Sequence, residues 1–265
     1  FHADNRTLES ITDCDLIARS HRAVDAAAEL TRARFSRYLM PLMFKRAEAD
    51  VMMKIARLGP SVTTEDLFAN LDFVTAHIDR EISRLCEHAR GLGLDDVLVE
   101  TDNAVESLSK HANGPTFLEE VQQTLSRIGA RTPRMYLPYS SRSWSENPES
   151  FFTLIAAGIR GRHTMDADRA DKRQLVRSRL PRFLHKRWDK TVTALRALHV
   201  AREGSLYLIE EWFVEARRVM DEIAHRLVER GILANPSDVT YALFDEVESA
   251  LFAEEPSSDL QQRIS

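Results

Sequence analysis

The sequence predicts an all-α fold, a multi-helix bundle of about nine to eleven helices with one long irregular loop. Apolar residues recur every three or four positions in nearly every long segment, which is the period of an amphipathic helix. The 265 residues contain only nine Gly and nine Pro, fewer than a loop-rich β-sandwich or a Gly-rich nucleotide-binding fold would need. No segment shows an alternation of apolar and polar residues strong enough to predict a sheet.

Capping and breaking residues delimit the helices of the N-terminal half. Thr12 or Asp13 is placed to cap the first helix. Pro41 lacks an amide proton and clashes with the previous turn, so we expect it to kink or end that helix. Thr63 with Asp66 three residues later is a capping pattern. In chain order, the first helix is expected over 13–39, the second from there to about Leu58, and a short third one after Thr63. The fourth is expected from Phe73 to Gly91, which would cap it in the left-handed conformation. Thr101 would cap a fifth over 102–112, and a sixth is expected from Pro115 to Gly129.

Residues 130–147 break the helical pattern. The segment contains two prolines and four serines, which preclude a regular helix. Eighteen residues is long for a connection without secondary structure, and long ordered loops often carry function. We therefore expect an irregular loop over about 130–147 with a functional role.

The C-terminal half has the most regular apolar pattern. Asn147 is placed to cap a helix with Pro148 in its first turn, Pro181 separates two helices, and Gly231 ends the longest one. Asn235–Asp238 is a turn sequence, in which Asp238 is placed to cap. Helices are expected over 148–160, up to Pro181, from Phe183 to Leu198, from Glu203 to Gly231 and over Phe244–Phe252, with a short extended piece at Val239–Leu243.

The amino-acid composition bears on the cellular compartment of the protein and on contact with membranes. Cys14 and Cys86 are the only cysteines, too few for a disulfide framework or a cysteine-based zinc site, and they fit a reducing cytoplasm. The longest apolar runs, such as 151–159, fall far short of the roughly 20 residues that span a bilayer, so we expect no membrane partner. The chain begins at Phe1 rather than Met, which suggests a piece of a longer protein.

Charge is distributed unevenly along the chain. The net charge is −5, yet residues 159–202 carry thirteen Lys or Arg against four Asp or Glu. One interpretation is a solvated arginine-rich helix that faces an acidic surface of the protein, and another is contact with a phosphate or nucleotide. Nucleic acid is not expected, because the whole chain is acidic and no stacking-aromatic motif accompanies the charges.

Residue patterns of known catalytic sites are missing from the sequence. There is no Walker loop, no G-x-G-x-x-G, no H-E-x-x-H and no di-iron pattern. Asp95-Asp96 with Glu100 resembles an acidic metal motif of helical terpenoid enzymes, but the second element is missing and a role at a helix start is favoured. His185, His199 and His225 have no evident nucleophile partner and are interpreted as structural. No catalytic residue and no metal ligand is therefore assigned.

The remaining candidate residues are large apolar side chains. Their spacing indicates helix packing first, but flexible Met and large aromatic rings also line pockets for bulky apolar ligands. The residues concerned are Phe35, Tyr38, Met40, Met43, Phe44, Met52, Met53, Trp188, Trp212, Phe213 and Met220.

Two stretches of the chain carry a resemblance to a known family. They are Gly129-Ala-Arg131 with Arg142-Ser-Trp144-Ser-Glu-Asn-Pro148, and Arg202-Glu203-Gly204-Ser205 with Arg226-Leu-Val-Glu-Arg-Gly231, Asn235-Pro-Ser-Asp238-Val239 and Leu243-Phe-Asp-Glu246-Val247. Together they resemble the helical region of phosphoenolpyruvate-synthase-like phosphotransferases, relatives of which include rifampin phosphotransferases and condensing enzymes of prodigiosin biosynthesis. The resemblance covers roughly 125–255. It divides the chain into an N-terminal helical subdomain, 1–124, and a C-terminal one, 125–265, expected to pack as one unit.

The resemblance implies that acceptor binding and phosphate transfer are carried out by different domains. In that family the helical region lies between an ATP-grasp domain and a swivelling phosphohistidine domain, and neither the ATP-grasp domain nor the histidine loop is present in this sequence. An acidic pair common in the family is replaced near Met135 and Leu137. The resemblance therefore implies a non-catalytic, cytoplasmic fragment that binds no cofactor itself and holds a bulky apolar acceptor molecule. ATP and Mg²⁺ are implied for the full-length parent, and its ATP-grasp and phosphohistidine domains are the implied partners.

Six residues are assigned to acceptor binding. Arg131 and Arg202 would neutralise incoming charge, while aromatic and Met side chains would line the pocket. Each has a structural alternative: Trp144 as an anchor of the loop, for example, and Arg202 with Glu203 as an ion pair at a helix junction. The assigned residues are Arg131, Trp144, Arg202, Trp212, Phe213 and Met220.

Two other functions remain open from the sequence. The first is a non-catalytic helical interaction module that uses the basic segment 159–202 against an acidic partner. The second is a self-contained helical enzyme of the terpenoid-synthase kind, which the missing metal motifs argue against.

Overall fold

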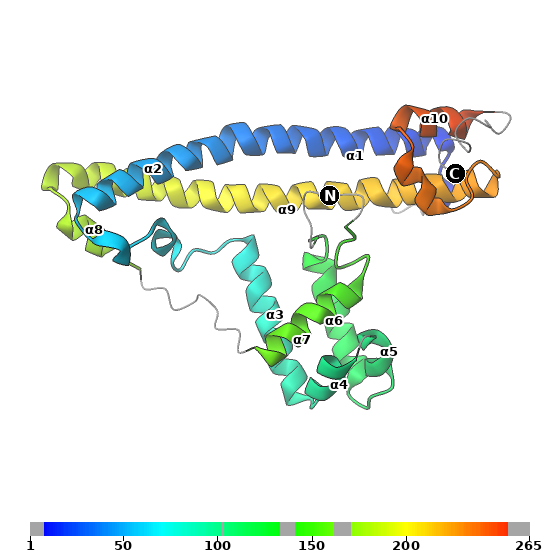
Figure 1. Ribbon diagram of the computed structural model, residues 1–265, viewed down its shortest axis with the longest axis horizontal. Helices are drawn as coiled ribbons and strands as arrows, with labels where there is room; N and C mark the ends of the chain where they lie inside the picture. Colours follow the sequence, from blue (N-terminus) through cyan, green and yellow to red (C-terminus); the bar gives the residue numbers. More distant parts are fainter. Residues whose placement is uncertain (1–7, 102, 133–140, 162–170, 254–265) are drawn as a thin grey trace. The chain divides into compact units, whose positions relative to one another are not determined.

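The structure, a computed structural model, describes residues 8–101, 103–132, 141–161 and 171–253 (Figure 1). The described residues form ten α-helices, joined by short 3-10 segments and one π-helical segment, and contain no strand. This confirms the all-α prediction. The helices are α1 (Asp13–Ala33), α2 (Met40–Ile55), α3 (Val74–Gly91), α4 (Asp95–Glu100), α5 (Ala104–Ser109), α6 (Gly114–Ile128), α7 (Pro148–Arg160), α8 (Arg173–Arg179), α9 (His185–Glu229) and α10 (Phe244–Phe252).

The chain divides into two compact units. The first unit comprises Phe1–Glu29, Thr132–Arg142 and Ile209–Ser265, and the second comprises Leu30–Arg131 and Ser143–Leu208. The divisions fall inside α1 and α9, so segments distant in sequence belong to one unit. A boundary between subdomains at residue 124 stays a prediction.

The first unit is built around the beginning of α1 and the last turns of α9, with α10 beside them. Arg226 of α9 and Arg230, directly after its end, donate to the two carboxylate oxygens of Asp13, at 2.7 and 2.6 Å. Burial raises the pKa of Asp13, but these two hydrogen bonds outweigh it and the pKa is lowered. Asp13 also lies in the first turn of α1, where a negative charge is favourable. The buried core comprises Ile11, Leu16, Ile17, Val219, Met220, Ile223, Leu227, Ile232, Val247 and Leu251 among others.

The second unit contains two separate hydrophobic cores. In one, α3 to α7 pack together, as Figure 1 shows for these five helices, and the buried side chains include Leu85, Leu98, Leu108, Phe117, Trp144, Phe151 and Ile155. In the other, α2 and α8 pack with the first turns of α9, and the buried side chains include Leu42, Met52, Met53, Leu67, Val176, Trp188 and Leu195. The indole of Trp188 donates to the carbonyl of Arg173, 3.2 Å away, so its polar atom is satisfied inside this core.

Pro41 does not end the first helix. The chain passes from α1 through a π-helical segment, Arg34–Leu39, and continues as α2 with Pro41 in its first turn. The amide of Met40 donates to the carbonyl of Phe35, five residues back. In an α-helix the carbonyl of Arg37 would meet the proline ring and lack a donor, and a widened turn relieves that conflict. Of the two outcomes expected at Pro41, a kink or an end, the helix end does not occur, and the regular α-helix is instead interrupted by the π-helical segment.

The long C-terminal helix is also more continuous than predicted. Residues 203–204 lie inside α9, so there is no helix junction at Arg202. Of the predicted extended piece Val239–Leu243, the first three residues lie in a 3-10 segment, Pro236–Tyr241, and only Ala242 and Leu243 are extended. Asn235 and Asp238 form the capping pair of the 3-10 segment. The left-handed glycine after α3 is Gly93, not Gly91, whereas Gly231 takes that conformation after α9 as the sequence indicates.

Other helix ends are capped by the kind of interaction that the sequence predicts, although the details differ. The amide of Thr63 donates to the Asp66 carboxylate at 2.8 Å, although the helix that follows is a 3-10 segment, Thr64–Phe68. The cap of α5 is Asn103 rather than Thr101, and its side chain accepts from the amide of Glu106.

None of the described helices is both long enough and apolar enough to cross a membrane.

The irregular loop is confirmed where it is described. Residues 131–132 and 141–147 form no helix, while Met135 and Leu137 lie outside the described residues. The amide of Ser143 donates to the Glu146 carboxylate at 2.8 Å, which closes a tight turn around Trp144. This turn leads into α7, with Asn147 and Pro148 at its start as predicted.

Two glycines provide a test of this packing. A methyl group on Gly114 would lie 1.7 Å from the backbone carbonyl oxygen of Leu108, whereas one on Gly204 would meet no atom within 4 Å. Gly114→Ala should therefore lower the free energy of unfolding by about 3 kcal/mol through overpacking. Gly204→Ala should raise it by up to about 1 kcal/mol, because alanine has the higher helix propensity. Urea denaturation followed by circular dichroism measures both, and equal stabilities would contradict the assigned packing.

Candidate binding site

The six residues assigned to acceptor binding lie in both units. Arg131, Trp144 and Arg202 belong to the second unit, and Trp212, Phe213 and Met220 belong to the first. Trp212 and Phe213 are half-buried and Met220 is a core residue. A single site formed by all six stays a prediction.

Arg131 and Trp144 are neighbours in the structure. The amide of Trp144 donates to the carbonyl of Arg131 at 3.0 Å. The indole ring of Trp144 is buried in the core of α3 to α7, with its centroid 5.2 Å from that of Phe151. Trp144 therefore anchors the loop on this core.

Arg202 lies in a group of polar and aromatic side chains that we call the α9 cluster: Phe68, Phe73, Thr75, His199, Arg202 and Glu203. The guanidinium of Arg202 pairs with the carboxylate of Glu203 at 2.7 Å, which confirms the ion pair inferred from the sequence. The other carboxylate oxygen of Glu203 accepts from the hydroxyl of Thr75 at 2.8 Å. Because Glu203 is buried, these two bonds stabilise a charge that would otherwise be costly.

His199 is held between two phenylalanine rings. Its imidazole is stacked on Phe68, with centroids 4.1 Å apart and planes at 21°. Phe73 meets it edge-on, with centroids 4.9 Å apart and planes at 84°. Both arrangements are favourable aromatic geometries, and together they fix the orientation of the ring.

Arg196 fixes the backbone that presents Phe68. Its guanidinium donates to the carbonyls of Leu67 and Ala69, at 2.6 and 3.0 Å. Asn70 follows with a φ of 57°, a left-handed conformation that Asn tolerates better than most residues. One arginine on α9 thus holds both neighbours of Phe68, and the ring is positioned against His199 from the same helix.

Several polar atoms in and beside the cluster are buried without a hydrogen-bond partner among the described residues. They are Nδ1 of His199, Nε of Arg202 and Oε2 of the neighbouring Glu65. An unsatisfied buried donor or acceptor costs about 1–3 kcal/mol, so native proteins rarely leave one without a partner or a purpose. Three such atoms on adjacent elements mark a place where water or a ligand group would complete the hydrogen bonding.

The electrostatic surroundings keep His199 neutral. Burial lowers the pKa of His199, and the nearby guanidinium groups of Arg202 and Arg46 lower it further. The carboxylates of Glu203 and Glu65 act in the opposite direction but do not restore the ordinary value. At neutral pH the imidazole therefore offers one donor and one acceptor nitrogen.

This arrangement suits a hydroxylated aromatic ligand. Phe68 and Phe73 provide apolar surface, neutral His199 exchanges a hydrogen bond with a hydroxyl group, and Arg202 adds a positive charge. Nδ1 of His199 is buried, so a ligand reaches it only after surrounding side chains move. No group of three or more His, Cys, Asp or Glu side chains in the described part of the chain is arranged to hold a metal ion.

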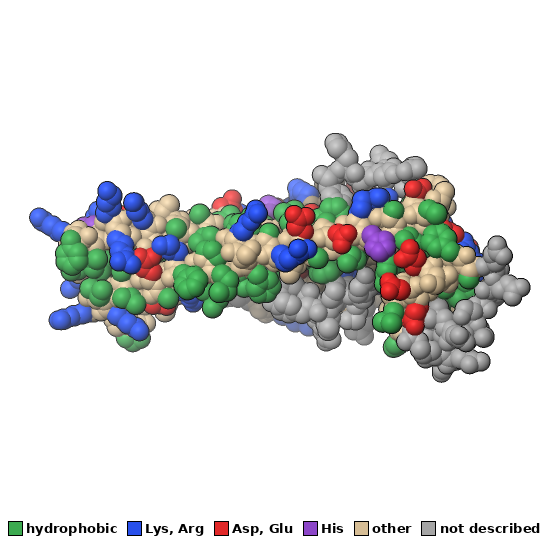
Figure 2. Space-filling view, turned by 90° about the horizontal axis from the view of Figure 1, so that it is seen from above, with side chains coloured by type: hydrophobic (Ala, Val, Ile, Leu, Met, Phe, Trp, Pro, Cys, Tyr) green, Lys and Arg blue, Asp and Glu red, His purple; other side chains and the backbone are tan. Residues whose placement is uncertain are grey.

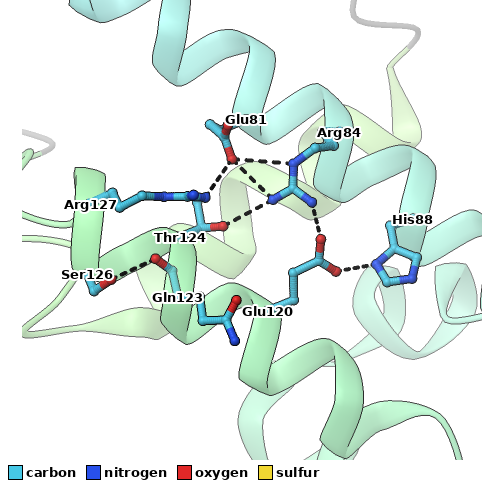
Figure 3. A network of polar contacts seen from close by, with 8 residues as sticks. All are labelled: Glu81, Arg84, His88, Glu120, Gln123, Thr124, Ser126 and Arg127. Carbon is cyan, nitrogen blue, oxygen red and sulfur yellow. Dashed lines mark hydrogen bonds and ion pairs between the residues drawn. The ribbon is translucent and has the colours of Figure 1, made fainter.

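A second polar network, between α3 and α6, differs from the cluster in being well paired (Figure 3). Glu120 accepts from Arg84 and contacts Nδ1 of His88. Glu81 pairs with Arg84 and Arg127, each at 3.1 Å. Burial raises the pKa of Glu120, but its bonds to Arg84 and His88 outweigh that effect and lower it. The network links the two helices through surface ion pairs and serves their packing.

Other polar residues singled out in the sequence occupy structural positions. The thiol of Cys86 is buried 3.5 Å from the carbonyl of Ile155, and burial raises its pKa, which makes it unreactive. Asp95 and Asp96 lie in the first turn of α4, which confirms the predicted role at a helix start. The amide of Asn235 donates to Asp238 at 2.9 Å, which confirms the predicted cap.

Comparison with known proteins places the chain in a family. A family model described as the rifampicin phosphotransferase fourth domain matches residues 34–207, well over half of the sequence. The chain belongs to this family. None of the curated proteins compared with the chain matches it. The match includes the helices before residue 125, which the resemblance did not reach, and it ends before the motifs at 226–247.

The α9 cluster lies within the residues that the family model matches. Phe68, Phe73, His199 and Arg202 all lie within 34–207, whereas Trp212, Phe213 and Met220 lie outside it. Sequence reasoning interpreted His199 as structural and did not select the two phenylalanines. The spacing of His199 and Glu203, four residues apart on one helix face, was the available signal.

The pKa of His199 generates a prediction about pH. Because folding lowers this pKa below 6.5, the unfolded state binds the proton first, and the free energy of unfolding should fall as pH drops below about 6.5. His199→Gln should reduce that fall, even though it loses ring stacking and is less stable at every pH. Midpoints of urea denaturation at pH 7.5 and 5.5 measure the slope of the unfolding free energy with pH. His225 is exposed on the same helix, and His225→Gln is the control. A slope unchanged by His199→Gln would contradict the assignment.

Proposed function

We propose that this chain is the acceptor-binding helical domain of a multidomain, ATP-dependent phosphotransferase or synthetase that uses a phosphohistidine, in antibiotic modification or natural-product biosynthesis. The observation that carries the proposal is the family match, which places the chain in a domain family of rifampicin phosphotransferases. The chain itself supplies binding rather than catalysis. ATP and Mg²⁺ are bound by other domains of the cytoplasmic parent.

The α9 cluster is the proposed place of acceptor binding. A phosphoryl acceptor is a hydroxyl compound, and rifampicin phosphotransferases are named for a large aromatic one. Phe68 and Phe73 offer ring surface to such a molecule, and the unpartnered nitrogen of His199 offers a hydrogen bond to its hydroxyl group. The cost of the unsatisfied atoms is recovered when the ligand pairs with them, which favours the bound state.

Arg202 is suited to the charge that arrives with phosphate. Phosphoryl transfer depends mainly on positioning and on neutralising negative charge. The Arg202 side chain pairs with Glu203 through one nitrogen, while its buried Nε atom has no partner in the described part of the chain. A guanidinium in this state has donors left for a phosphate oxygen.

Binding of rifampicin, used as a probe, tests the first part of the proposal. Isothermal titration calorimetry of the whole chain should show binding, and Arg202→Met should weaken it about ten-fold through the loss of a charge-assisted hydrogen bond. Arg202→Lys, which keeps the charge, should weaken it less. Lys110→Met, at the exposed residue directly after α5, is the control. If neither rifampicin nor another hydroxylated polycyclic aromatic binds, the proposed function is wrong.

Half-reactions in the full-length parent test the second part. Arg131→Ala or Arg202→Ala should reduce acceptor phosphorylation by about a hundred-fold, the usual effect of removing a group that stabilises transferred charge. Transfer of phosphate from ATP to the histidine should continue at its normal rate, because neither arginine takes part in it. Radiolabelled ATP separates the two steps. Loss of both steps together would contradict the assigned roles.

A further inference from the structure

A strongly basic surface surrounds the turn between α8 and α9. Residues 177–190, which we call the basic tip, contain six Lys or Arg and a single acidic residue, Asp189. Phe183 lies in the middle of this segment with 81% of its surface exposed. Figure 2 shows Lys and Arg side chains gathered around the beginning of α9. Phe183 therefore offers an apolar contact in the middle of this cationic surface.

Ion pairs within the chain neutralise only part of this charge. Arg177 pairs with Asp189 at 3.0 Å, and Arg187 pairs with Glu48 at 2.5 Å. Four further cations are exposed and have no hydrogen bond or ion pair within the described part of the chain: Arg179, Arg182, Lys186 and Lys190. Lys186 and Lys190 are four residues apart in α9 and share one face of it, while Arg182 lies in the 3-10 segment Arg182–Leu184 just before α9. Like charges at this spacing destabilise a helix, and a negatively charged partner would relieve the repulsion.

An acidic surface with exposed apolar side chains is present in the first unit. Residues 231–253, which we call the acidic face, contain four Asp or Glu and no Lys or Arg. Tyr241 and Leu243 are exposed by 73% and 65%, and Phe252 is about half-exposed. Asp and Glu side chains lie over α10 in Figure 2. The acidic face therefore has the charge opposite to that of the basic tip, and it also offers apolar contacts for an aromatic ring.

We propose that copies of this chain associate through these two surfaces, with the basic tip of one copy bound to the acidic face of the next. Arg182, Lys186 and Lys190 would pair with Asp245 and Glu248, and Phe183 would pack between Tyr241 and Leu243. The complementary charges and the exposed apolar side chains on both surfaces favour a second copy as the occupant. The interface is heterologous, so it forms rings or open chains rather than a two-fold dimer. The proposal is independent of acceptor binding.

Sedimentation velocity of the whole chain tests the association. Over a series of protein concentrations, the mean mass should rise above that of the monomer at low salt and return to it at high salt, because salt screens the charges. Arg182→Glu with Lys186→Glu, and separately Phe183→Ser, should each weaken association about ten-fold. Lys110→Glu, a charge reversal at the exposed residue directly after α5, should leave it unchanged.

Charge exchange gives the decisive measurement. Asp245→Lys with Glu248→Lys should disrupt association as the tip reversal does, and a mixture of the two reversed proteins should associate again. Circular dichroism confirms that each variant folds. A chain that stays monomeric at every salt concentration, or reversed proteins that fail to restore association, would overturn the proposal. So would tip-dependent binding of the monomer to vesicles of phosphatidylserine and phosphatidylcholine, which would make the tip a membrane surface.

Discussion

The constraint on which most of this structure depends is that α9 carries buried charges as well as apolar side chains. Glu203, Glu210, Glu215 and Arg217 are all buried on this single helix of 45 residues. A buried charge is tolerated only when other groups pair with it, since its loss of hydration costs several kcal/mol or more. Thr75 therefore bonds to Glu203, the amide of Thr132 to Glu210, and Arg19 to Glu215, each within its own unit. These pairings fix which segments lie beside each stretch of α9.

The α9 cluster and the network between α3 and α6 differ in how completely their polar groups are hydrogen-bonded. The network of Arg84, His88 and Glu120 has partners for its charged groups, and its effect is to hold α3 against α6. In the α9 cluster the imidazole of His199 and the guanidinium of Arg202 each retain a buried atom without a partner among the described residues. An unsatisfied buried polar atom is costly, so a further hydrogen-bond partner would stabilise the cluster more than the network. The presence of a histidine and an arginine is common to both, so residue types alone do not separate them.

Local sequence rules predicted the helices well where the deciding interaction is local. The caps at Asp238 and Asp66 and the glycine after α9 depend on residues three or four apart, and each occurs as expected. The failures lie where packing outweighs a local preference. Gly204 costs a helix about 1 kcal/mol relative to Ala, which the packing of the surrounding turns exceeds, and α9 continues. At Pro41 a π-helical segment removes the steric conflict that a simple α-helix would have had.

The candidate site was predictable only in part, for the same physical reason. Arg202 was found through a motif that includes Glu203, its neighbour in sequence and its ion-pair partner. The contacts of His199 with Phe68 and Phe73 join segments about 130 residues apart, and no helical periodicity encodes them. Such contacts arise because Arg196, one turn before His199, binds the carbonyls on either side of Phe68. The position of the Phe68 ring is thus set by a side chain on the same helix as the histidine, and the geometry of the cluster follows from α9 rather than from the 3-10 segment that carries Phe68.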